Sequence, residues 1–125
     1  MPMAYTIDRN ARLIRIVGTG RLTDEEMVEC ISSLRTDPKL EPSMNTLSDM
    51  RDIEVGFSTE GVERMIAVMK GTAERRAAAK AAIVVSSDAA FGMARIVEMR
   101  SEERADPSFR VFRDMVAACE WLGID

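Results

Sequence analysis

The residues of this chain that could do chemistry are carboxylates and serines, because the sequence contains no histidine. Histidine is the commonest general base and metal ligand, so catalysis would have to use acids, hydroxyls, thiols or amines. Asp49 and Asp52 could form a carboxylate pair for acid–base chemistry or for a hard cation, but acids in a loop are more often simply solvated. Because no third acid stands at ligand spacing, we expect no metal site.

A second candidate is the segment Ser86, Ser87 and Asp88, which joins an apolar run to the start of a helix. Free N–H groups at that helix start could hold an anion, with Arg51 or Arg95 as its counter-charge. A carboxylate already at the cap competes with an anion, so simple capping is the favoured interpretation. No histidine activates the serines and no G-x-S-x-G sequence surrounds them. We therefore expect a protein that is not an enzyme and has no cofactor.

Length and charge restrict the remaining classes of protein. A chain of 125 residues is expected to fold as a single domain over residues 1–125. The net charge of −4 and the few aromatic residues predict no nucleic-acid partner. The basic cluster of Arg75, Arg76 and Lys80 is interpreted as cations near a helix C-terminus, where the helix dipole favours them.

The cellular compartment is predicted from the absence of two sequence patterns, a membrane span and a signal peptide. No apolar run approaches the length of about 18 residues that indicates a membrane span. The first ten residues do not have the pattern of a signal peptide, so we expect a cytoplasmic protein. In that reducing compartment Cys30 and Cys119 are expected to be free thiols packed on apolar helix faces.

Hydrophobic spacing and turn chemistry predict the order β-β-α-β-α-β-α-β-α. This order indicates an α/β fold with one mostly parallel five-stranded sheet and an antiparallel N-terminal edge strand. The predicted strands are residues 5–8, 12–18, 44–50, 82–85 and 109–112. The predicted helices are residues 24–34, 58–78, 89 onward and 115–122.

Two boundaries in this prediction place candidate residues. Gly18, Thr19 and Gly20 are expected to end the second strand, and residues 51–57 are expected to be a loop. In an open α/β sheet, ligands bind outside the carboxyl ends of the parallel strands. We expect that edge to collect Gly18, Asp49, Arg51, Asp52, Ser86, Ser87, Asp88 and Arg113.

The helix after Asp88 carries more apolar surface than one sheet should need. Ala90, Ala94 and Val97 follow one stripe with Met93, and further apolar side chains widen that stripe around the helix. Such a helix is expected to be covered on more than one side, either within the fold or by a partner. The candidate interaction face consists of Phe91, Met93, Ile96 and Met99.

Several motifs together resemble the SpoIIAA-like fold group, which contains STAS domains and uncharacterised bacterial members. They are an apolar strand and a Ser/Asp turn before FGMAR at residues 91–95, then VFRD at 111–114 before a helix that ends in Ala-x-x-Trp-Leu at 118–122. The segment LSDMRDIEVGFSTEG at residues 47–61 is similar to a STAS strand that leads into a serine-containing helix start. The resemblance covers about half of the chain and implies a SpoIIAA-like fold.

The same resemblance implies functions as well as a fold. STAS domains imply a regulatory module that contacts proteins, here as a homodimer or with another protein, and a phosphorylation switch at Ser58 or Thr59. Those hydroxyls could instead simply cap the second helix, and Glu60 stands where it would repel a phosphate. The related CRAL-TRIO domains imply the alternative function, which is to bind a lipid or another apolar small molecule. The ten methionines of the chain favour a soft, adaptable core for such a ligand.

Overall fold

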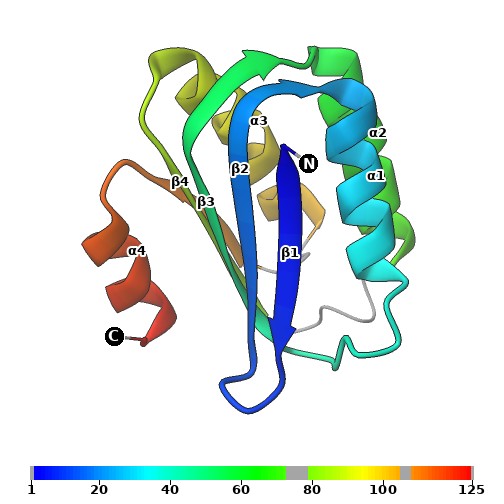
Figure 1. The fold of residues 1–125 in the computed structure, drawn as a ribbon, viewed down its shortest axis with the longest axis vertical. Coiled ribbons are helices and arrows are strands. Elements are labelled where there is room, and N and C mark those ends of the chain that lie inside the picture. The colour runs from blue at the N-terminus through cyan, green and yellow to red at the C-terminus, as the bar shows by residue number, and fades with distance from the viewer. Residues whose placement is uncertain (1, 73–78, 105–107, 125) are drawn as a thin grey trace.

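Five strands form one sheet in the order β1-β2-β3-β4-β5 (Figure 1). The computed structural model describes residues 2–72, 79–104 and 108–124. Strand β1 is antiparallel to β2 and all other pairs are parallel, which confirms the predicted α/β fold with its antiparallel edge strand. The elements are β1 (Met3–Asp8), β2 (Leu13–Thr23), α1 (Asp24–Arg35), β3 (Asn45–Gly56), α2 (Thr59–Gly71), β4 (Lys80–Val85), α3 (Asp88–Arg104), β5 (Ser108–Phe112) and α4 (Met115–Leu122).

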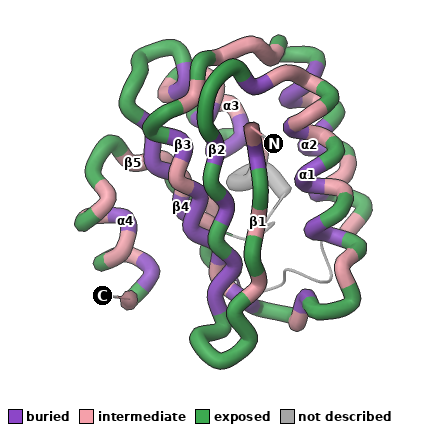
Figure 2. Tube along the Cα trace, viewed as in Figure 1, coloured by how far each residue is buried: buried purple, intermediate pink, exposed green. Residues whose placement is uncertain are grey.

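Helices cover both faces of the sheet and create two apolar clusters. Helices α1, α2 and α3 lie on one face and α4 lies on the other (Figure 1). The larger cluster joins α1, α2 and α3 to the sheet and includes Ile14 and Val85. The smaller cluster joins α4 to the sheet through residues such as Leu13 and Leu122. Buried residues are concentrated on the central strands and on the inner sides of these helices (Figure 2).

Strands β2 and β3 are longer than the sequence pattern indicates. Gly18, Thr19 and Gly20 do not end β2, which continues to Thr23, and residues 51–56 belong to β3. The two extensions pair with each other, after a shift of register between Val17 and Thr19. That pairing satisfies the backbone hydrogen bonds of two polar segments which look like loops when each is considered alone. Consequently Asp49 lies within β3 and not near its carboxyl end.

The predicted start of α1 is confirmed by a complete capping box. The Thr23 hydroxyl accepts a hydrogen bond from the Glu26 N–H, and the Glu26 carboxylate accepts one from the Thr23 N–H. This reciprocal arrangement satisfies two donors that a helix start leaves unpaired. At the other end of the chain, Asp114 caps α4 and Gly123 ends it in the left-handed conformation, also as predicted.

Helices α2 and α3 differ in length from the prediction. Helix α2 ends at Gly71, and the predicted continuation to residue 78, with Arg75 and Arg76, lies outside the described residues. Lys80 begins β4, and its ammonium group contacts the carbonyl oxygen and the ring of Trp121. Helix α3 extends to Arg104, into a segment predicted as a polar break.

Both cysteines are free, as predicted. Cys30 is buried against the larger cluster, and this burial raises the pKa of its thiol to about 11. Cys119 is only partly buried, which differs from the expectation that both thiols lie in the core. None of the helices in the described ranges has the length and apolar character needed to cross a membrane.

Candidate functional site

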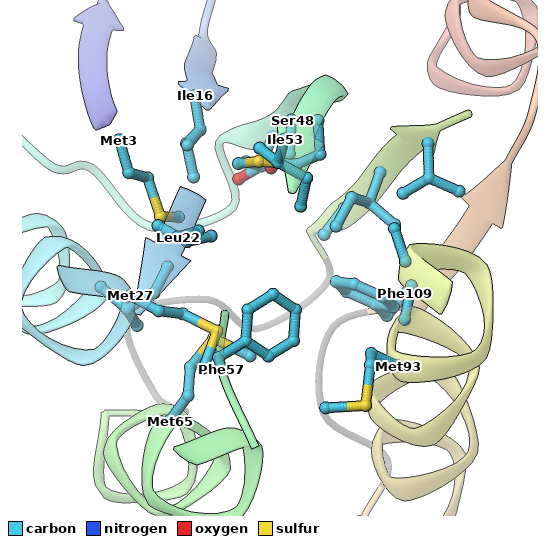
Figure 3. A pocket seen from close by; sticks show the side chains of 18 of the residues that line it. Met3, Ile16, Leu22, Met27, Ser48, Ile53, Phe57, Met65, Met93 and Phe109 are labelled. Atoms are coloured by element: carbon cyan, nitrogen blue, oxygen red, sulfur yellow. The ribbon is translucent and has the colours of Figure 1, made fainter. Parts of the chain in front are cut away.

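An apolar cavity of about 110 Å³ lies between the sheet and the three helices α1, α2 and α3 (Figure 3). Of the 21 described residues that line it, only Arg35, Thr46 and Ser48 are polar. For comparison, an engineered cavity of about 150 Å³ lined by apolar side chains binds benzene. The space is therefore apolar and close in size to a cavity that holds a six-carbon ring, and its flexible side chains must adjust to admit a guest of that size.

The strands form the floor of the cavity. Ile16, Ser48 and Ile83 are register neighbours on β2, β3 and β4, and all three line the space. Side chains alternate between the faces of a strand, so these three share the helix-covered face. A serine between two isoleucines occupies less volume than the apolar residue that usually fills such a place. The sequence thus leaves room at the centre of the floor.

Small residues on α3 leave further room. Ala90 and Ala94 are four positions apart on one side of α3, and both line the cavity. Met93 from α3 and Phe109 from β5 lie on one side of the space, and Phe57 reaches into it from the segment before α2 (Figure 3). A cavity forms where alanines, and not larger side chains, face a neighbouring layer.

Methionines make up much of the remaining wall. Six of the ten methionines line the cavity, namely Met3, Met27, Met50, Met65, Met69 and Met93. Methionine is unbranched and adapts its shape to the group beside it. The predicted soft core is therefore gathered around this space, so the cavity can adjust to guests of different shape.

A buried carboxylate fixes α3 beside the edge strand β5 and so holds the Phe109 side of the cavity. Glu98 is 8% exposed, and its Oε2 accepts a hydrogen bond of 2.8 Å from the Val111 N–H. Its other carboxylate oxygen pairs with Arg95. The backbone of an edge strand otherwise presents open N–H groups. Arg95, which the sequence offered as a counter-charge for an anion, has a structural role instead.

Asp49 and Arg51 pair with each other and do not face the cavity. The Arg51 guanidinium donates two hydrogen bonds of 2.9 Å to the two carboxylate oxygens of Asp49. These hydrogen bonds are the main cause of the lowered pKa of Asp49. Asp49 follows Ser48 in the strand, so its side chain points to the opposite face of the sheet. Arg51 is therefore already paired with a carboxylate, and the charge of Asp52 acts on the same guanidinium.

Ser87 provides the cap of α3 at the predicted turn. Its hydroxyl accepts a hydrogen bond of 3.1 Å from the Ala90 N–H. Arg113 donates to the Asp88 carboxylate at 2.8 Å and to the Ser86 carbonyl oxygen at 3.4 Å. The guanidinium of Arg113 also lies over the ring of Phe91, 4.4 Å from its centroid. The favoured interpretation, capping of the helix, agrees with this geometry, although Ser87 and not Asp88 supplies the capping oxygen.

Ser58 lies at the start of α2, far along the chain from these groups, and caps that helix. Its hydroxyl accepts a hydrogen bond from the Gly61 N–H at 3.2 Å. Asp24, the first residue of α1, accepts hydrogen bonds from the Ser58 N–H at 2.7 Å and from its hydroxyl at 2.8 Å. Gly61 is required here because a Cβ at this position would overlap the Asp24 carboxylate. Thr59 follows as the exposed first residue of α2.

The Asp24 carboxylate should make the stability of the protein depend on pH in the acidic range. Its hydrogen bonds from Ser58 lower its pKa below the ordinary value of 3.8, so its stabilising effect is complete above that pH. The effect is lost as the pH falls below about 4 and passes through the lowered pKa. We expect Asp24→Asn to have a lower thermal midpoint than wild type at pH 7 and a smaller loss of midpoint between pH 5 and pH 2.

Glu25→Gln is the control for this prediction. Glu25 is the next residue in α1, and among the described residues its one ion pair is a loose contact of 3.8 Å with Arg64, between two largely exposed side chains. Such pairs contribute little. Its midpoint should therefore follow the wild-type pH profile. Parallel profiles for wild type and Asp24→Asn would show that the Asp24–Ser58 contact does not couple stability to pH.

The four apolar residues proposed as an interaction face are used mainly inside the fold. Phe91, Met93 and Ile96 are partly buried and pack against the larger core cluster. Only Met99 among the four is mainly exposed, at 54%. Helix α3 has a wide apolar face because it contacts the sheet on one side and borders the cavity on another. The need for covering on several sides is therefore largely met within the chain.

The sequence motifs implied an apolar ligand as an alternative function, but they did not identify Ser48 or the place of the cavity. Ser48 carried no sequence signal of a site, and Ala90 and Ala94 looked like ordinary members of a core stripe. A signal was available in the combination, since small residues on a buried strand and on a buried helix both leave volume unfilled. The sequence does not show that the two elements face each other across the same space.

The fold is that of a SpoIIAA-like α/β domain, as the sequence motifs predicted. A structural comparison finds an uncharacterised protein of the DUF3478 family from Shewanella loihica PV-4, which has a SpoIIAA-like fold. The two chains superpose with a TM-score of 0.62 at 18% sequence identity, over 96% of this chain and 93% of the other. No protein-family model matches the sequence, and no curated protein matches it. At this identity the likeness establishes the fold.

Proposed function

We propose that this chain is a non-enzymatic binding protein for a small apolar molecule, which it holds between the sheet and helices α1, α2 and α3. The observation that carries the proposal is the cavity of about 110 Å³ with its almost wholly apolar lining. Binding removes apolar ligand surface from water, and this transfer contributes a favourable free energy of about 25 cal/mol for each Å² buried. A pocket that is apolar apart from a few polar groups is the usual form of a small-molecule site.

This function receives more support than self-association through α3. Of the four residues proposed for that surface, Met99 alone is mainly exposed. Stable homodimers bury about 800 Å² or more per partner in a largely apolar patch. The exposed large hydrophobic residues of the described chain are Val17, Met99 and Val116, which lie on β2, α3 and α4. Homodimerisation therefore stays a prediction without a surface of matching chemistry.

A phosphorylation switch at Ser58 also receives less support. The Ser58 hydroxyl already caps α2 and donates to Asp24. A phosphate would add almost two negative charges directly beside that carboxylate. It would also remove the hydroxyl hydrogen that Asp24 accepts. Phosphorylation would therefore weaken the junction between α1 and α2.

Methyl NMR of the methionines tests the proposed function. Protein labelled with ¹³C at the methionine methyl groups is titrated with methylcyclopentane, a small apolar probe. We expect the resonances of methionines that line the cavity, such as Met65 and Met93, to shift in a saturable manner. Met99 is exposed on α3 and Met115 lies on α4, so both should keep their positions.

The pattern of shifts decides the result. Saturable shifts confined to the cavity methionines would support binding in the proposed site. Equal shifts of Met99 and Met115 would indicate general adsorption, and the absence of any shift up to the solubility of the probe would overturn the proposal.

A further inference from the structure

The polar side chains that line the cavity indicate which chemical groups a ligand would have. Ser48 is 8% exposed and lines the cavity from the middle of β3 (Figure 3). Among the residues that the structure describes, none is placed to hydrogen-bond with its hydroxyl. Buried polar side chains nearly always have a partner, because an unpaired hydroxyl loses its hydration without compensation. This hydroxyl is therefore available to a guest.

The neighbours of Ser48 in the sheet restrict what can satisfy it. Across β2 and β4 it is flanked by Ile16 and Ile83, whose side chains have no polar atoms. A hydroxyl both donates and accepts a hydrogen bond, so it can pair with an alcohol, a carbonyl or an amide. A ligand group that occupies the centre of the floor would meet this hydroxyl and apolar carbon on either side.

Arg35 is the cationic residue among those that line the cavity, and its contacts stabilise the fold. It is 5% exposed, and its Nη1 donates to the hydroxyl of Thr72 at 2.9 Å and to the carbonyl oxygen of Met69 at 3.3 Å. These acceptors lie at the C-terminal end of α2, where a cation complements the helix dipole. An anionic ligand would have to compete with these contacts and would lose its own hydration on entering the cavity.

We infer that the ligand is a neutral molecule with one hydrogen-bonding group on an otherwise apolar skeleton, and that this group pairs with the Ser48 hydroxyl. The inference rests on the proposed function, because it assigns the chemistry of the ligand in the same cavity. It distinguishes the site from one for a plain hydrocarbon and from one for a fatty-acid carboxylate.

Three probes of equal heavy-atom count test the inference by calorimetric or NMR titration. They are cyclopentanol, methylcyclopentane and cyclopropanecarboxylate, which present a hydroxyl, a methyl group and a carboxylate. We expect Ser48→Ala to weaken cyclopentanol binding about fivefold, which corresponds to the net contribution of one neutral hydrogen bond. The variant should bind methylcyclopentane as tightly as wild type or more tightly, and neither protein should bind the carboxylate at pH 7.

Ser33→Ala is the matched control, since Ser33 is exposed on α1 and does not line the cavity. It should keep the wild-type affinity for every probe. Equal affinities of wild type and Ser48→Ala for cyclopentanol would overturn the Ser48 inference while leaving the binding function intact. Binding of the carboxylate as tightly as cyclopentanol would overturn the inference that the ligand is neutral. Failure of methylcyclopentane to bind wild type would instead overturn the proposed function itself.

Loss of folding cannot produce the expected result. A general loss of structure in Ser48→Ala would weaken both cyclopentanol and methylcyclopentane, whereas the inference requires the effect to be specific to the alcohol. Thermal unfolding of the variant provides a second check. Its midpoint should be no lower than that of wild type, because the substitution removes an unpaired buried hydroxyl.

Discussion

Ala94→Leu will weaken binding of methylcyclopentane about tenfold to hundredfold while the protein keeps its fold and stability. Ala94 is 5% exposed and lines the cavity from α3. A leucine there places three more carbon atoms in the space that the guest would occupy. A guest that remains must then overpack the core, which costs about 1–3 kcal/mol. Filling a cavity in the empty protein commonly stabilises it by about 0.5–2 kcal/mol.

Ala89→Leu is the matched control for this blocking variant. Ala89 is exposed near the start of the same helix and does not line the cavity, so its substitution adds the same carbon atoms without entering the site. Its affinity for the probe should equal that of wild type. Titration and denaturant unfolding of both variants check the prediction. Unchanged probe affinity in a folded Ala94→Leu protein would show that the probe binds somewhere else.

Leu122→Ala is expected to have the opposite profile, with a large loss of stability and little change in intrinsic probe affinity. Leu122 is 6% exposed and belongs to the cluster that holds α4 on the face of the sheet away from the cavity. Truncation of a buried leucine removes transfer free energy and leaves a void, at a cost of about 2–5 kcal/mol. Denaturant unfolding should detect a loss of about 3 kcal/mol.

Val116→Ala provides the comparison on the same helix. Val116 is 63% exposed on α4, and its truncation should change the free energy of unfolding by no more than about 0.5 kcal/mol. A loss as large as that of Leu122→Ala would mean that α4 is held by contacts other than those of the smaller cluster. Loss of probe binding in a Leu122→Ala protein that remains folded would mean that the two faces of the sheet are coupled.

The order of elements could be predicted from the sequence because local residue patterns mark where helices begin and end. Thr23 and Glu26 supply a capping box, and Gly123 supplies a left-handed helix end. The extensions of β2 and β3 could not be predicted in this way. Residues 51–56 become a strand because β2 lies beside them, so their conformation depends on a partner distant in sequence.

The candidate site shows the same division between local and long-range information. Capping by Ser58 follows from a serine before a helical pattern. Capping at the start of α3 was predicted in the same way, but with Asp88 in the role that Ser87 takes. The cavity depends on β3 and α3 facing each other across one space, and no local pattern contains that relation. Asp49 and Arg51 were candidates because of their charge, yet they satisfy each other on the other face of the sheet.

The most direct test of the central claim is a crystal structure of the protein soaked with bromocyclopentane, with diffraction measured near the bromine absorption edge. The anomalous signal locates the bromine independently of any assumption about the site. The proposed function predicts a peak inside the cavity, between Ser48 on the sheet and Ala94 on α3. A fully soaked crystal with bromine peaks only on the surface, and none in the cavity, would contradict the claim that this chain binds small apolar molecules there.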